Sequence, residues 1–169
     1  SNNMTTTFYK TNENYGIKFI LSSSNSPFYH ENTINFEPKT SLAFDADYDS
    51  KFIPSPIPDV PYVNMRNETG EGFILNTIDN SKEEVTIPLE IYTPTEGVYY
   101  IQPSVLDKSD YKYIWLEDTK TGLRKDFDGS AIPVRGKEDG ITTDYVIHLS
   151  KIDNSSKIEQ AVFASDLII

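Results

Sequence analysis

The sequence predicts an all-β fold, namely an antiparallel β-sandwich of jelly-roll or immunoglobulin-like type with about nine to ten short strands. Short runs in which apolar and polar residues alternate recur along the chain. Turn-forming residues separate these runs at a spacing of roughly ten residues, which is typical of sandwiches and barrels. The chain is also rich in aromatic residues, with 11 Tyr and 9 Phe among 169 residues, and these side chains fit a half-buried pleated surface.

Residues 84–92 alternate most cleanly, and Pro88 falls on the polar side of that run. Because proline cannot donate to a sheet ladder, Pro88 indicates an edge strand or a bulge. Other strands are expected at residues 15–21, 33–36, 60–65, 72–78, 97–102, 111–117, 123–127, 142–149 and 158–164. We expect the core to be lined by inward-facing apolar side chains from three of these strands: Val85, Ile87, Leu89, Ile91, Ile114, Leu116, Ile147 and Leu149.

The length of 169 residues suits one domain, which we place at residues 15–169. Residues 1–14 are expected to be a flexible N-terminal segment whose polar start is typical of a cloning remnant, and the chain is interpreted as an excised piece of a longer protein. The proline-rich residues 51–61 are expected to form an extended loop. Residues 151–169 are either a last strand or the beginning of a linker.

The net charge of −11 limits the classes of partner. An acidic domain repels phosphate backbones and anionic membrane surfaces, so neither nucleic-acid binding nor membrane insertion is expected. No run of about 18 apolar residues occurs, so no transmembrane helix is predicted. The absence of cysteine excludes disulfides, thiolate–zinc sites and a thiol nucleophile. Cations, polysaccharides and other proteins stay open as partners.

Three carboxylates alternate at Asp45, Asp47 and Asp49. Carboxylate oxygens at such a spacing could converge on calcium, which would be the one cofactor of an otherwise cofactor-free domain. The EF-hand pattern fails, because Ser50 and Pro56 stand where it needs Gly and Glu. The alternative is an acidic turn in which Asp side chains accept hydrogen bonds from the local backbone.

Three aromatic residues alternate along residues 111–117, at Tyr111, Tyr113 and Trp115. Side chains two residues apart on a strand share a face, so these rings could form a platform that stacks on sugar rings. The alternative is packing or cross-strand pairing, because the opposite face of this strand is apolar too. Tyr99 and Tyr100 must point to opposite faces, so at most one of them could join a platform.

No catalytic constellation is recognisable, and no catalytic residue is assigned. The two histidines are His30, in a polar stretch expected to be a loop, and His148, expected to face outward opposite Ile147 and Leu149. No Gly-x-Ser-x-Gly elbow accompanies them. Glycosidase chemistry needs two carboxyl groups across a cleft, and sequence spacing cannot select such a pair.

Seven short motifs follow one another along residues 44–149. The first is F-D-A-D-Y-D-S-K at residues 44–51. Six further segments follow: 59–63 (D-V-P-Y-V), 72–78 (G-F-I-L-N-T-I), 85–91 (V-T-I-P-L-E-I), 97–101 (G-V-Y-Y-I), 114–122 (I-W-L-E-D-T-K-T-G) and 144–149 (D-Y-V-I-H-L). The first motif is similar to the signature G-F-D-x-x-Y-D-A-x-K, and the whole series in its order resembles large surface proteins exported by the bacterial type IX secretion system. The resemblance implies a non-catalytic β-sandwich module that precedes a C-terminal sorting domain.

We therefore expect a structural or interaction module of a secreted or cell-surface bacterial protein, such as an accessory domain of an adhesin. Its partners would be neighbouring domains of the parent protein, a surface polysaccharide or another protein. The alternative function is a carbohydrate-binding module that uses Tyr111, Tyr113 and Trp115, with calcium at Asp45, Asp47 and Asp49. A glycosidase-type enzyme fragment is the third alternative.

Overall fold

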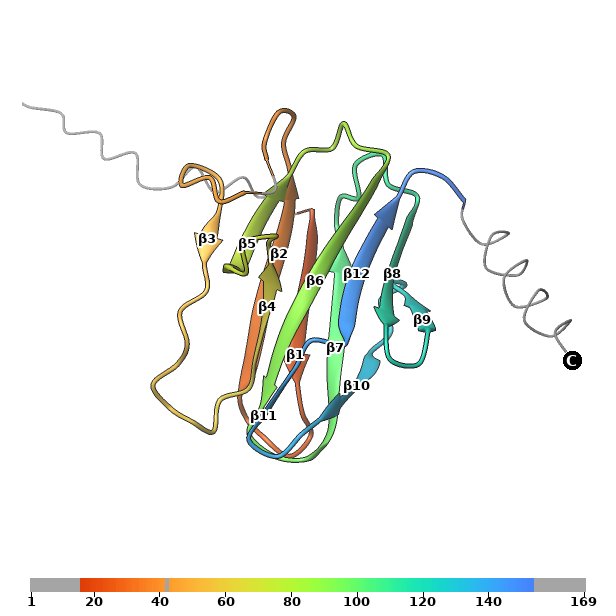
Figure 1. Cartoon of the computed structure of the whole chain (residues 1–169). Helices are drawn as coiled ribbons and strands as arrows, with labels where there is room; N and C mark the ends of the chain where they lie inside the picture. The colour runs from red at the N-terminus through yellow and green to blue at the C-terminus, as the bar shows by residue number, and fades with distance from the viewer. Residues whose placement is uncertain (1–15, 42, 154–169) are drawn as a thin grey trace, which may run out of the picture.

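The computed structural model describes residues 16–41 and 43–153, which form twelve strands and no helix (Figure 1). The predicted all-β class is therefore confirmed for this part of the chain, in which no helix could cross a membrane. The segment expected at 1–14 and the strand expected at 158–164 lie outside the described residues. The strands are β1 (Ile17–Ser22), β2 (Tyr29–Phe36), β3 (Ser50–Lys51), β4 (Tyr62–Arg66), β5 (Gly72–Ile78), β6 (Glu84–Thr93), β7 (Gly97–Val105), β8 (Tyr113–Asp118), β9 (Leu123–Asp126), β10 (Ile132–Gly136), β11 (Gly140–Thr142) and β12 (Tyr145–Ser150).

Ten strands form one continuous path in the order β10-β7-β1-β2-β5-β4-β6-β12-β8-β9, with β11 paired to β6 and β3 to β5. The pair β2 and β5 runs parallel, whereas the other pairs run antiparallel. The expectation of a purely antiparallel sheet is therefore wrong at this pair, and the sheet is mixed. Parallel neighbours need a long connection, which the chain between β2 and β5 supplies together with β3 and β4.

The path curls around one hydrophobic core. In Figure 1, β1, β2 and β7 form a layer behind β4, β6 and β12. The predicted core residues are all buried, none more than 7% exposed, which confirms the expected inward face: Val85, Ile87, Leu89, Ile91, Ile114, Leu116, Ile147 and Leu149. They share one cluster with Ile17, Phe19 and Leu21 of β1. The two end regions of the path come close together, since the Gln102 amide of β7, the strand next to β10, donates to the Gly129 carbonyl just beyond β9.

Two elements differ from the sequence prediction in ways that matter for function. Strand β10 was not expected, because Pro133 interrupts its short alternation of Ile132 and Val134. It lies at one end of the path, where a proline removes no inner ladder bond. Strand β2 begins at Tyr29, four residues before the expected start, and its first residues are polar rather than alternating. His30 therefore lies on a strand, not in a loop.

Pro88 predicted an edge strand or a bulge. Strand β6 is an inner strand of the path, so it is not an edge strand as a whole, and its register with β12 runs regularly up to Pro88. Pro88 lies opposite Val146 of β12, at the end of the segment of β6 that pairs with β12. From Leu89 onward, β6 pairs with β4 instead. A residue without an N–H group is tolerated at this position because the pairing with β12 ends at Pro88 and the pairing with β4 begins at the next residue.

Candidate functional site

The fold separates one of the three aromatic residues predicted as a platform, Tyr111, from the other two. Tyr111 precedes β8, is fully buried, and packs against Phe36 with a ring-centroid distance of 5.6 Å. Its hydroxyl donates to the Lys82 carbonyl at 3.0 Å, and burial raises the pKa of this phenol. Tyr111 therefore belongs to the core and not to a ligand platform. A tyrosine could serve in the core or on a ligand platform, and the position of Tyr111 in the turn before β8 places it in the core.

Trp115 shares the outer face of β8 with Tyr113, yet only 8% of it is exposed. The His148 ring stacks on it at a centroid distance of 4.9 Å and an interplanar angle of 11°. The Arg124 guanidinium from β9 lies 4.9 Å from the indole centroid, within the range of a cation–π contact. These contacts join β12, β8 and β9 across their outer face, so Trp115 serves as a cross-strand packing residue.

Polar groups lie near both ring nitrogens of His148 in this cluster. Its Nε2 lies 2.7 Å from Glu117 Oε2, and its Nδ1 lies 3.4 Å from Thr86 Oγ1. The prediction that His148 faces outward, opposite Ile147 and Leu149, is confirmed. A hydroxyl, an imidazole and a carboxylate thus lie close together on the outer face of three neighbouring strands, with Glu117 one row away from Thr86 and His148. These groups lie outside the groove described next, and the indole stacks on the imidazole.

Tyr113 is the exposed member of the predicted platform, at 39%. It lines a groove of about 590 Å³ between the end of β7 and the strands β8 and β9. Two lysines and two aspartates share this groove: Lys108, Lys112, Asp126 and Asp128. Ser130 donates to the Asp128 carboxylate through its backbone N–H and its hydroxyl, and these bonds lower the pKa of Asp128. Asp128 is therefore held ionised, which is the opposite of what a general acid for glycoside cleavage requires.

The acidic segment with the proposed calcium ligands forms a tight turn against β5. Asp49 is buried, and its two carboxylate oxygens accept the backbone N–H groups of Thr77 and Asp45, both at 2.8 Å. The carboxylate of Asp45 in turn accepts the N–H of Asp47 at 3.1 Å. Burial raises the pKa of Asp49. Among the described residues, no group of three His, Cys, Asp or Glu side chains is arranged to hold a metal ion.

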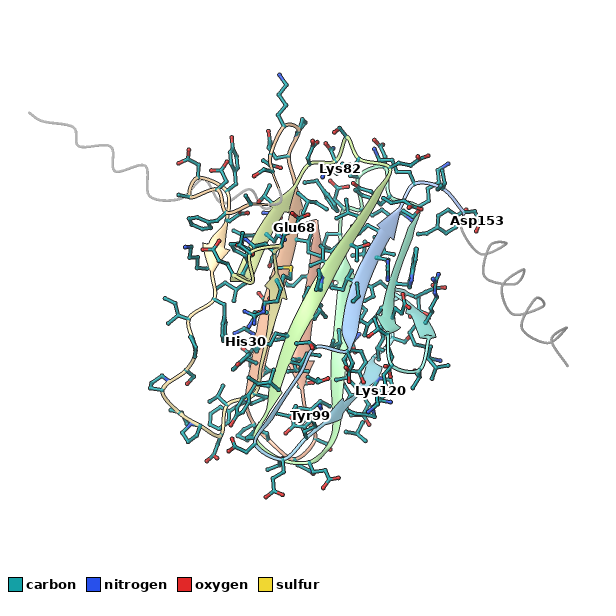
Figure 2. All side chains as sticks on the ribbon, in the orientation of Figure 1. His30, Glu68, Lys82, Tyr99, Lys120 and Asp153 are labelled. Carbon is teal, nitrogen blue, oxygen red and sulfur yellow. The ribbon has the colours of Figure 1, made fainter. Side chains whose placement is uncertain are left out.

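His30 of β2, labelled in Figure 2, reaches the backbone of β4 with its side chain. Its Nδ1 accepts the Val63 N–H at 3.4 Å, while the Asn32 amide donates to the Val63 carbonyl at 2.8 Å. These two side chains bond both backbone groups of Val63, as a neighbouring strand would. Phe52 packs edge-on against the imidazole. Burial lowers the pKa of His30, which suits an imidazole that must stay neutral to accept a bond.

Two exposed tyrosines that were not assigned to a site gather on another face of the sheet. Tyr29 begins β2 and Tyr100 lies on β7, and both pair with Ser22 of β1. Tyr99 points into the core, as alternation requires when Tyr100 points outward. The tyrosine doublet at 99–100 predicts one inward and one outward ring, so the sequence could have indicated Tyr100. It gave no such indication for Tyr29, because the strand residues after it are polar and do not alternate.

Comparisons with known proteins bring no relative: no protein-family model, no curated protein and no solved structure matches this chain.

Proposed function

We propose that this chain is a non-catalytic structural or interaction module of a secreted or cell-surface bacterial protein, adhesin-like in its role. One observation carries the proposal: the histidine, carboxylate and indole side chains that could serve catalysis or binding instead hold strands together. His30 and Asn32 bond β4, Asp49 fastens its turn to β5, and Trp115 with His148 joins β12 to β8. Such use of histidine, carboxylate and indole groups fits a scaffold better than an enzyme.

The proposed location is the bacterial cell surface or the extracellular medium. The ordered motifs that resemble type IX secretion cargo support it, and the absence of cysteine is compatible with it. The proposed partners are neighbouring domains of the parent protein, with a surface polysaccharide or another protein as further candidates. For the architecture, we propose a flattened sandwich of jelly-roll type, supported by the two layers in Figure 1.

The location can be tested with antibodies raised against the purified domain. Intact cells of the source bacterium, or their culture medium, should react with the antibody without permeabilisation. A signal that appears only after permeabilisation would overturn the surface assignment. This experiment does not depend on knowing a ligand.

The absence of catalysis can be tested by incubating the folded domain with panels of aryl glycosides and aryl esters. We expect no turnover above buffer. The groove beside Tyr113 is the place to examine if turnover appears, because Asp126 and Asp128 both line it. Hydrolysis that disappears in Asp126→Asn or Asp128→Asn would replace the scaffold proposal with the glycosidase alternative.

A further inference from the structure

The outer face of β2, β1, β7 and β10 presents two tyrosines in one row. Ser22 of β1 pairs with Tyr29 of β2 on one side and with Tyr100 of β7 on the other, and Tyr100 pairs with Pro133 of β10. Directly paired residues project from the same face of a sheet. This face is the outer one, because the neighbouring residues Leu21 and Tyr99 are buried in the core.

Both rings are accessible: Tyr29 is 66% exposed and Tyr100 is 37% exposed. One strand separates their strands, so their backbones lie about 9.5 Å apart, which is two interstrand spacings. Ser22, between them, is too small to rise to the height of the rings. The row therefore places an exposed aromatic side chain on either side of a low centre, and we call this arrangement the Tyr29–Tyr100 platform.

Polar side chains border the platform on the next row of the same face. Ile20 of β1 pairs with Glu31 on β2 and with Gln102 on β7, and both of these polar residues are exposed. Lys18 lies 3.1 Å from Glu31, and Arg135 beside the platform lies 2.7 Å from Asp118. The charges on this face are therefore paired, although the chain as a whole carries −11.

We propose that the Tyr29–Tyr100 platform binds a segment of a neutral polysaccharide. Sugar rings present apolar C–H faces that stack on aromatic rings. Their hydroxyl rims can donate to the carboxylate of Glu31, which also pairs with Lys18, and to the amide oxygen of Gln102, whose amide nitrogen donates to the Gly129 carbonyl. The strands that carry the two tyrosines lie about 9.5 Å apart, a span that an extended segment of a few sugar units can cover. The paired charges disfavour a strongly ionic ligand.

This proposal rests on the proposed function and deepens it, because it gives the candidate polysaccharide partner a chemical class and a place on the fold. It also places sugar binding away from Trp115, which is covered. Affinity electrophoresis tests it directly, because a chain of net charge −11 migrates readily in a native gel. The probes are soluble β-glucan, xylan, glucomannan and starch, each dissolved in the gel. We expect at least one of them to retard the wild-type domain.

The variants Tyr29→Ala and Tyr100→Ala should each weaken that retardation by up to about tenfold in affinity, and the double variant should abolish it. Tyr29→Phe keeps the ring and should retain binding. Ser22→Ile keeps both tyrosines but raises the centre of the platform, so it should weaken binding. Tyr48→Ala is the matched control, since Tyr48 is exposed elsewhere and should leave retardation unchanged. Tyr113→Ala separates the platform from the groove beside Tyr113: loss of retardation in this variant alone would assign the sugar to the groove and overturn the proposal.

Circular dichroism and thermal melts of every variant establish that the fold is kept. Unchanged retardation of a folded double variant would overturn the proposal, as would a wild-type domain that none of the four polysaccharides retards. Sedimentation equilibrium covers the other occupant, a second copy of the chain: a dimer that the double variant dissociates would assign this face to self-association instead. Antibody labelling of cells is independent of all these outcomes, so failure here leaves the surface assignment standing.

Discussion

Two outer faces of the same curled sheet use aromatic residues in opposite ways. On β12, β8 and β9, Trp115 is stacked by His148 and approached by Arg124, and little of it remains exposed. On β2, β1 and β7, Tyr29 and Tyr100 flank a small serine and stay open. The difference lies in the neighbours: long side chains on adjacent strands cover the first face, while Ser22 covers nothing on the second.

The largest expected difference between the two faces is in the stability lost when an aromatic residue is replaced by alanine. Trp115→Ala should lower the free energy of unfolding by about 3 kcal/mol, because it removes a buried ring from a packed cross-strand cluster. Tyr29→Ala should change it by no more than about 0.5 kcal/mol, because Tyr29 is mostly exposed. Urea denaturation measures both values. Equal losses for the two variants would break the comparison.

The acidic turn gives the next effect. Asp49→Ala should cost about 2 kcal/mol, because it leaves the N–H groups of Thr77 and Asp45 without their carboxylate acceptor. Asp47→Ala is the control and should cost far less, since Asp47 is exposed. Thermal melts with calcium and with a chelator should coincide for the wild type. A melting temperature that rises with calcium, and does so less in Asp47→Ala, would restore the calcium alternative.

A smaller effect concerns the cover over Trp115. Arg124→Ala should remove the cation–π contact and lower stability by about 0.5–1 kcal/mol. The chain has a single tryptophan, so its fluorescence reports this site alone. We expect a red-shifted emission maximum and stronger quenching by acrylamide than in the wild type. Lys120→Ala, an exposed charge in the loop after β8, should leave both quantities unchanged. Unaltered fluorescence in Arg124→Ala would mean that other groups cover the indole.

The smallest expected effect is a pH dependence of the free energy of unfolding, and it comes from His30 on β2, the strand that also carries Tyr29. Burial lowers the pKa of His30 in the folded state, so the unfolded state binds more protons as the pH falls below about 6.5. The free energy of unfolding should therefore decline as the pH falls through that value, and level off below the folded-state pKa. His30→Gln should flatten this part of the profile measured by urea denaturation. A wild-type profile that is level from neutral pH to pH 5, or unchanged by the substitution, would contradict this role.

The local pattern carried enough information for the inner faces of the strands. The alternation of Val85, Ile87, Leu89 and Ile91 placed those residues in the core, because period-two apolar patterning leaves one face to be buried. His148 followed from the same logic on β12. The pattern failed where strand residues are polar or proline, as at His30 and Pro133, because such residues carry no periodic hydrophobic signal.

By itself, the sequence determined the all-β class, the inward-facing residues and the lack of a recognisable catalytic motif, because these depend on residue type and short-range spacing. Only the tertiary structure decided that β2 and β5 run parallel, that Tyr111 lies in the core, and that Trp115 is covered while Tyr29 and Tyr100 are open. Exposure of an outer-face residue depends on the side chains of adjacent strands. Some of those strands lie far apart in the sequence, such as β12 beside β8 and β7 beside β1, so their pairing is set by the folded chain and not by local pattern.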